Sequence, residues 1–249
     1  MKVSFFEEFP NKNSLKKLEL VKFKTTVYVA AKSIQEFERI KRQVSKKNVT
    51  LGYWPILDKK EGYWLSPFSS AKAVKRVIKD IENYKKPLEI MWDAELPFRH
   101  PWLFLRVDYF LRNKPKIKSF FRRKGKEILT SEYPTRNKIT GFLLKCLGVS
   151  FSPKKYKNKK IIMYYTSMHK LVRKIFLNNI RHLSKRYGKD LQVGLGVIAT
   201  GILGNEPILS PKQLARDLKE MKQIGVKEVV IFRLAGLNEK YIKVIKEFL

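Results

Sequence analysis

Two acidic residues close a short apolar stretch with a spacing that suits acid–base chemistry. Asp93 and Glu95 end the stretch 88–97, LEIMWDAELP, whose composition is typical of a buried strand. Side chains alternate along a strand, so residues two apart point to the same side. A pair of carboxyl groups on one side can supply a general acid and its partner. We therefore take Asp93 and Glu95 as candidate catalytic residues.

Carboxylates also end two other apolar stretches. The stretch 127–132 ends at Glu132, and the first stretch of the chain ends in Glu7 and Glu8, one of which must point inward. Adjacent strands lie roughly 4.8 Å apart, so we expect Glu132 beside Asp93 and Glu95. Glu132 at that place would allow an ordinary two-carboxylate glycosidase mechanism. In such a mechanism, the separation of the carboxyl groups decides whether the anomeric configuration of the sugar is retained or inverted.

Eight strand-like runs recur along the chain and provide the elements that position these acids. Segments with helical periodicity lie between most of them, and this alternation is typical of a parallel sheet with helices outside. The length of 249 residues matches the roughly 250 of one TIM barrel. The sequence predicts an α/β fold, a single (β/α)8 TIM barrel of eight parallel strands over residues 1–249. The runs are 3–8, 25–31, 49–57, 88–94, 127–132, 161–166, 191–199 and 228–234.

A barrel of this kind builds its site at the carboxyl ends of its strands. Polar and aromatic side chains at the other strand ends are therefore expected to join the acids. Tyr165 is expected to take part in catalysis, and Arg233 to act as a counter-charge or substrate clamp. Trp54 and Trp64 are expected to form a stacking floor for the ligand, and Asn205 and Glu206 lie in the loop after the seventh strand.

Two short stretches carry a resemblance to a known family. Asp93-Ala94-Glu95 resembles the close of the D-x-x-D-x-D-x-E motif of chitinase-type barrel glycoside hydrolases, and Met163-Tyr164-Tyr165 is similar to their M-x-Y-D stretch. The resemblance implies that Glu95 is the general acid, that Asp93 positions the substrate's acetamide, and that Tyr165 supports the same group. The earlier Asp positions of the motif are Leu88 and Met91 here, and Thr166 follows the tyrosine.

Metal chemistry is the competing hypothesis for the same acids. The chain has only three histidines, His100, His169 and His182, without H-x-H or H-E-x-x-H spacing, and its single cysteine excludes a thiolate zinc site. No metal or other cofactor is therefore favoured. In the alternative, oxygen ligands hold magnesium or manganese in a phosphodiesterase or nuclease, with His169 as a base. Those ligands are Glu8, Asp93, Glu95 and Glu132.

The charge of the chain predicts an anionic partner. Lys and Arg number 54 against 22 Asp and Glu, a formal net charge of +32. Cations interleave with aromatic residues in an extended connection, 99–126, between the fourth and fifth strands, and a second basic cluster precedes the sixth. We expect one basic face from Arg112, Lys114, Lys116, Lys118, Arg122, Arg123, Lys124, Lys154, Lys155 and Lys157.

Such a face suits more than one partner. On nucleic acid, cations neutralise phosphates while aromatic rings stack on bases. On an anionic membrane, Trp102, Phe104 and Phe110 would insert. In a third interpretation the aromatics pack the helix on the barrel and the cations are solvated, as in a lysine-rich, thermophilic proteome. The functional hypotheses are a glycoside-hydrolase-like enzyme with a sugar-containing substrate, a nucleic-acid-binding protein or nuclease, and a non-catalytic basic platform.

Cysteine use and the start of the chain predict a cytoplasmic protein, at most peripheral to a membrane or bound to nucleic acid. Cys146 has no partner for an internal disulfide, and acids stand near the start, where a signal peptide needs apolar residues. No run approaches the roughly 20 apolar residues of a membrane span.

Helix-capping residues fix the register of three outer helices. Ser33 with Glu36 has capping-box spacing, and Ser210 with Pro211 opens a helix that ends at Gly225. Asn238 is expected to cap the last helix.

Overall fold

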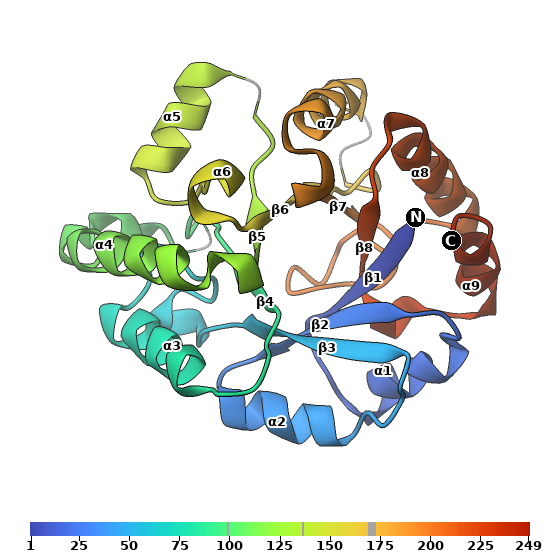
Figure 1. Ribbon diagram of the computed structural model, residues 1–249, viewed down its shortest axis with the longest axis horizontal. Helices are drawn as coiled ribbons and strands as arrows, with labels where there is room; N and C mark the ends of the chain where they lie inside the picture. The colour runs from blue at the N-terminus through green and yellow to red at the C-terminus, as the bar shows by residue number, and fades with distance from the viewer. Residues whose placement is uncertain (99, 136, 169–172) are drawn as a thin grey trace.

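The protein is a closed barrel of eight parallel strands, as the computed structural model shows for residues 1–98, 100–135, 137–168 and 173–249 (Figure 1). Each strand pairs with its sequence neighbours, and β1 pairs with β8 to close the ring. The predicted (β/α)8 TIM barrel is confirmed. The strands are β1 (Lys2–Glu7), β2 (Thr25–Ala31), β3 (Val49–Pro55), β4 (Ile90–Asp93), β5 (Ile128–Glu132), β6 (Lys159–Tyr164), β7 (Leu191–Gly196) and β8 (Glu228–Phe232).

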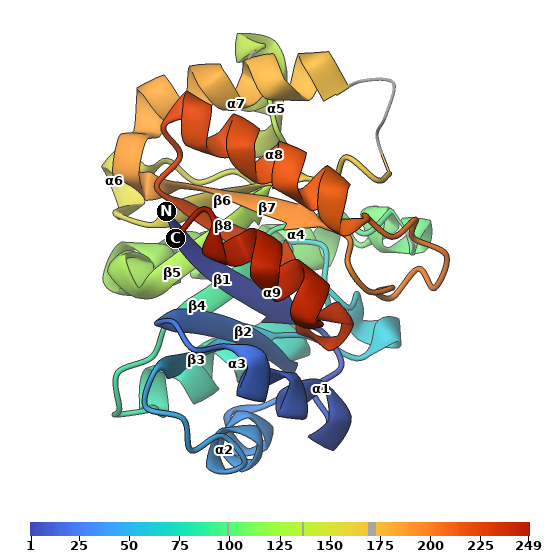
Figure 2. The same cartoon turned by 90° about the vertical axis from the view of Figure 1, so that its right-hand side faces the viewer.

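Helices surround the strands, and the loops that follow the strands gather at one end, where the β7–α8 loop projects in the side view (Figure 2). The α-helices are α1 (Lys12–Lys16), α2 (Ile34–Arg42), α3 (Ala71–Asn83), α4 (Val107–Lys124), α5 (Lys138–Cys146), α6 (Pro153–Tyr156), α7 (Arg173–Tyr187), α8 (Pro211–Ile224) and α9 (Glu239–Lys246). Short 3-10 turns are η1 (Lys17–Leu20), η2 (Lys59–Glu61), η3 (Pro101–Leu105), η4 (Gly125–Glu127), η5 (Gly188–Asp190) and η6 (Leu234–Gly236).

Alternation along the strands divides the core into two layers. Phe6, Met91 and Val230 belong to a cluster inside the barrel. Their neighbours Phe5 and Trp92 point the other way and join the larger cluster beneath the helices. A shift of one residue in any strand would exchange the two sets, so the alternation fixes which strand-end residues face the barrel mouth.

The helix signals in the sequence agree with the structure, apart from one detail. The hydroxyl of Ser33 accepts the amide of Glu36 at 3.2 Å, but the Glu36 carboxylate accepts the amide of Lys32 instead of completing the box with Ser33. At α8 the box is complete between Ser210 and Gln213, and Gly225 ends the helix with a φ of +85°, where glycine is unstrained. Asn238 caps α9 as predicted.

The connection between β4 and β5 consists largely of η3 and α4. Phe104 and Phe110 pack on Phe68 of the preceding β3–α3 connection, with ring centroids 5.2 and 5.0 Å apart respectively. This agrees with the interpretation in which these aromatic residues pack within the protein, and not with their insertion into a membrane. Trp102 remains exposed.

Trp92 anchors α4 to the barrel and provides a test of this packing. Its ring lies 5.5 Å from those of Phe120 and Phe121, and its indole N–H donates to the carbonyl of Leu65 at 3.1 Å. We expect Trp92→Ala to lower the free energy of unfolding by about 3–5 kcal/mol in urea denaturation. The matched control Trp102→Ala should change it by about 0.5 kcal/mol or less. Equal losses in the two variants would contradict the packing described.

Candidate active site

A cavity of about 360 Å³ lies at the carboxyl ends of the strands. Aromatic side chains and carboxylates make up much of its wall. None of the described residues that line it is Lys, Arg or His. The wall includes Phe6, Glu8, Trp54, Trp64, Met91, Asp93, Glu95, Glu132, Tyr133, Met163, Tyr165, Glu206 and Phe232.

Asp93 and Glu95 both line this cavity, as their spacing predicted. Asp93 is only 4% exposed, and its Oδ1 has no hydrogen-bond partner among the described residues. Burial and then the neighbouring Glu95 raise the pKa of Asp93 well above its usual value, against a hydrogen bond from Ser131. Burial and then Glu8 raise the pKa of Glu95 to about 7. Each carboxyl is thus stabilised in its protonated form near neutral pH.

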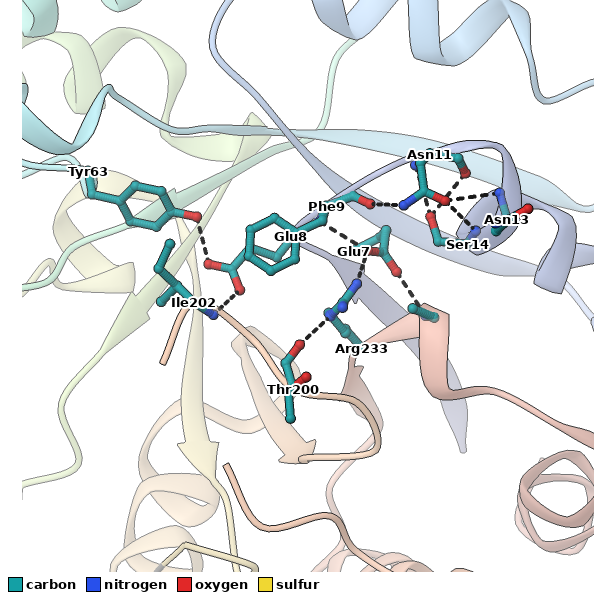
Figure 3. A network of polar contacts seen from close by, with 11 residues as sticks. Glu7, Glu8, Phe9, Asn11, Asn13, Ser14, Tyr63, Thr200, Ile202 and Arg233 are labelled. Carbon is teal, nitrogen blue, oxygen red and sulfur yellow. Dashed lines mark hydrogen bonds and ion pairs between the residues drawn. The ribbon is translucent and has the colours of Figure 1, made fainter. Parts of the chain in front are cut away.

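Glu8 is the inward member of the Glu7–Glu8 pair (Figure 3). The hydroxyl of Tyr63 donates to its Oε1 at 2.7 Å, and the amide of Ile202 donates to its Oε2 at 3.0 Å. Burial raises the pKa of Glu8 more than these hydrogen bonds lower it. Gly201 allows the backbone of this loop to lie close to Glu8, because a Cβ at that position would be 2.8 Å from Glu8 Oε2.

The loop after β7 contributes one of the two residues expected from it. Glu206 is buried in the cavity wall; its Oε1 accepts the amide of Leu203 at 3.0 Å, whereas its Oε2 has no partner among the described residues. Asn205 is exposed and does not line the cavity.

The predicted aromatic residues Tyr165, Trp54 and Trp64 all line the cavity. The ring of Tyr165 lies 5.8 Å from that of Phe232, and burial followed by the charge of Asp93 raises the pKa of its hydroxyl. The buried indole N–H of Trp54 has no partner among the described residues. Trp54 Nε1, Asp93 Oδ1 and Glu206 Oε2 are therefore polar atoms of cavity-lining residues that a ligand could satisfy.

Glu132 differs from expectation. Its Oε2 accepts Lys160 Nζ at 2.6 Å, and its Oε1 accepts the Thr130 hydroxyl at 2.8 Å and the amide of Phe151 at 3.1 Å. The strand register pairs Asp93 with Ser131, so Ser131 takes the inward position and Glu132 the outward one. Glu132 borders the cavity, but both of its carboxylate oxygens are already occupied by protein groups.

Of the two roles expected for Arg233, the structure agrees with the counter-charge and not with the substrate clamp. Its Nη1 donates to Glu7 at 2.5 Å and its Nε donates to the carbonyl of Thr200 at 2.8 Å (Figure 3). It is absent from the cavity lining, although its charge reaches Glu8 and lowers the pKa of that carboxyl. Arg233 therefore neutralises Glu7 outside the cavity.

No three His, Cys, Asp or Glu side chains are grouped as a metal site within the part of the chain that the structure describes. The expected ligand set Glu8, Asp93, Glu95 and Glu132 is divided, because Glu132 is bound to Lys160. His169, the expected base of that alternative, lies outside the described residues.

The two basic clusters meet between α4 and α6, where burial and the nearby charges of Lys114, Lys155 and Arg122 lower the pKa of Lys118. Other cations of the predicted face are paired: Arg123 with Glu82 and Lys124 with Glu127. Arg112, Lys116, Lys154 and Lys157 are exposed.

Tyr63 and Ser131 were missed in the sequence. Tyr63 follows η2 in a connection without periodicity, and it reaches Glu8 only because the chain turns there. Ser131 could have been found, because it is the inward neighbour of Asp93 once β4 and β5 are placed in register.

Comparisons with known proteins find related structures but no related sequence. No family model and no curated protein matches the chain. The glycoside hydrolase domain of PgaB (BpsB) from Bordetella bronchiseptica is similar in structure, with a TM-score of 0.60 and 9% identity over 100% of this chain and 98% of that one. The Bacillus cereus spore cortex-lytic enzyme SleL has a TM-score of 0.57 and 10% identity, over 100% of this chain and 74% of its own.

A different enzyme class shares the barrel. D-allulose 3-epimerase from Methylomonas sp. has a TM-score of 0.55 and 9% identity, over 100% of this chain and 98% of its own. Identities this low establish the fold alone. At that level, the resemblance to barrel glycoside hydrolases inferred from Asp93-Ala94-Glu95 agrees with the presence of such domains among the similar structures.

The Lys160–Glu132 pair gives a prediction about stability. Lys160→Met leaves a buried carboxylate without its cation, so we expect it to lower the free energy of unfolding by about 3–5 kcal/mol in urea denaturation. Adding Glu132→Gln should restore part of that loss because the unpaired charge is gone. The control Lys159→Met, at the exposed neighbouring position, should have little effect. A double variant no more stable than Lys160→Met would contradict the pairing.

Proposed function

We propose that this chain is a barrel hydrolase of the glycoside-hydrolase type, acting on a sugar-containing substrate in the cavity at the carboxyl ends of its strands. The observation that carries the proposal is the pair Asp93 and Glu95, whose pKa values are both raised, in one cavity. Paired carboxyl groups with raised pKa values, in a cavity with aromatic walls, suit protonation of a glycosidic oxygen.

Glu95 is the proposed general acid. Its proton passes to the glycosidic oxygen as the bond from that oxygen to the sugar's anomeric carbon breaks. A pKa of about 7 keeps a large fraction of Glu95 protonated near neutral pH. When water later attacks the anomeric carbon, the Glu95 carboxylate takes up the water's proton and the acid is restored.

Asp93 and Tyr165 are proposed to hold the reacting sugar. The free Oδ1 of Asp93 can accept a hydrogen bond from the N–H of an acetamide group and so direct its carbonyl oxygen toward the anomeric carbon. Tyr165, which also lines the cavity, can donate its hydroxyl to the same group. Substrate-assisted hydrolysis of this kind needs no second carboxylate nucleophile. If the sugar lacks an acetamide, Glu8 is a better candidate partner than Glu132, whose oxygens are occupied.

The cavity is poorly suited to a phosphodiester. Glu8, Asp93, Glu95 and Glu206 lie in its wall, and no described lining residue carries a positive charge. A phosphate would find no cation in the described wall to offset its charge unless metal ions supplied it. The nuclease alternative with magnesium or manganese therefore requires cations that the described wall does not supply.

The basic exterior is proposed to serve a separate purpose, docking the enzyme on an anionic partner. The convergence of Lys114, Lys118, Arg122 and Lys155 supports such a surface because like charges kept together cost stability without a partner.

The acid–base assignment predicts the effect of replacing each carboxyl. On a panel of chromogenic glycosides, we expect Glu95→Gln to lower kcat by a factor of about 10²–10⁴, because the proton donor is lost. Asp93→Asn should lower kcat to a smaller extent, since substrate can still be protonated. Glu247→Gln, an exposed acid far along the chain, is the matched control and should leave activity unchanged.

Two outcomes would reject the assignment. One is full activity in Glu95→Gln on a glycoside that the wild type cleaves. The other is inactivity on all glycosides together with cleavage of a phosphodiester once manganese is added, which would favour the nuclease. Absence of any activity from the wild type and both variants would favour a non-catalytic platform.

The pH dependence follows from the direction of the Glu95 shift. A general acid works in its protonated form, so kcat/KM should fall about tenfold per pH unit as the pH rises above about 7, the pKa of Glu95. An unshifted glutamate, with its pKa near 4.5, would already place this fall in the acid range. Activity that stays level to pH 9 would show that Glu95 is not the proton donor.

A further inference from the structure

Helix α5 exposes an apolar face to solvent. Ile139, Phe142 and Leu143 are 71%, 64% and 53% exposed, and their spacing of three and four residues places them on one side of the helix. Of the α5 residues, Leu144 is the one that is buried. An outer helix of a barrel normally buries its apolar stripe against the strands, so α5 directs much of its apolar surface outward.

The position of α5 accounts for this. It lies at the periphery of the barrel between α4 and α7 (Figure 1). A groove separates part of α5 from the barrel, because Gly141 and Phe142 of α5 line it together with Ile162 of β6. The barrel is thus closed without the apolar face of α5.

Cations surround that face. Lys138 and Lys145 are exposed on α5 and form no ion pair with any described residue. Lys145 and Arg186 line the groove between α5 and α7 together with Phe142. On the other side, the Lys114 side chain of α4 packs beside Gly148, just beyond the end of α5.

We infer that α5 docks the protein on an anionic lipid bilayer, with Ile139, Phe142 and Leu143 in the interfacial region and Lys138, Lys145 and Arg186 at lipid phosphates. An apolar face between cations gains from both the burial of apolar surface and the attraction of anionic headgroups. This inference rests on the proposed docking to an anionic partner and is independent of the proposed hydrolysis. None of the helices within the described residues could itself cross a bilayer.

A bilayer fits this surface better than nucleic acid does. Phosphates would pair with the cations and a base could stack on the ring of Phe142, but Ile139 and Leu143 offer no such ring, and their apolar surface would remain in water. The apolar residues also occupy the centre of the patch, where a polyanion needs charge. Loss of binding when only apolar side chains are changed therefore distinguishes the two partners.

Cys146 allows the docking to be measured on the natural chain. It is the one cysteine in the sequence, it is exposed, and it lies seven residues after Ile139, on the same side of α5. An environment-sensitive fluorophore on Cys146 should shift its emission to the blue with vesicles of phosphatidylcholine and phosphatidylglycerol, and not with phosphatidylcholine alone. Co-sedimentation of unlabelled protein with the same vesicles should agree.

Matched variants separate apolar insertion from general charge attraction. Phe142→Ser with Leu143→Ser should weaken vesicle binding about tenfold or more, while leaving activity on any soluble glycoside unchanged. Lys138→Gln with Lys145→Gln should also weaken it. Lys240→Gln with Lys243→Gln removes the same charge from exposed positions on α9, across the barrel, and should have a smaller effect.

Three results would overturn the inference. Vesicle binding that is unchanged in Phe142→Ser with Leu143→Ser would show that the apolar face is not inserted. An equal loss in the α5 and α9 lysine variants would show attraction by net charge alone. Binding of a labelled oligonucleotide, lost with Lys138 and Lys145, without binding to vesicles would make the partner nucleic acid. Activity on a soluble glycoside reports separately on the proposed hydrolase.

Discussion

Burial of carboxyl groups without a neighbouring cation is the constraint on which the barrel mouth depends. The structure divides the strand-end acids into two sets. Glu7 and Glu132 point outward, and each is neutralised, by Arg233 and Lys160 respectively. Asp93 and Glu95 point inward, receive no such partner among the described residues, and have raised pKa values. An unpaired acid in such surroundings costs stability, and the retention of Asp93 and Glu95 beside a cavity supports the roles proposed for them.

The fold and half of the site follow from periodicity alone. Eight apolar runs predicted the barrel, and a spacing of two placed Asp93 and Glu95 together. Glu132 borders the cavity as predicted, but it points outward, because its orientation depends on the register between β4 and β5, which pairs Asp93 with Ser131 and which a single strand does not reveal. Arg233 was expected in the site because it follows β8. It instead forms an ion pair with Glu7 of the neighbouring strand β1.

The surface was less predictable than the interior. Composition indicated an anionic partner, and the sequence left open whether the aromatic residues of α4 contact it or pack on the barrel. Phe110 packs on Phe68, whereas Phe142 of the short α5 is exposed. Helical spacing shows which residues share a face but not whether that face is covered. Here a groove lies between α5 and strand β6, and the apolar face of α5 stays uncovered.

The proposed acid–base chemistry requires Glu95 to hold its proton near neutral pH. A carbon-13 NMR titration of the side-chain carboxyl groups in the wild type and in Glu95→Gln measures this directly. We expect a resonance that titrates near pH 7, the pKa given by the surroundings of Glu95, and that is missing from the variant. A Glu95 carboxyl that titrates near 4.5, the ordinary value for glutamate, would contradict it.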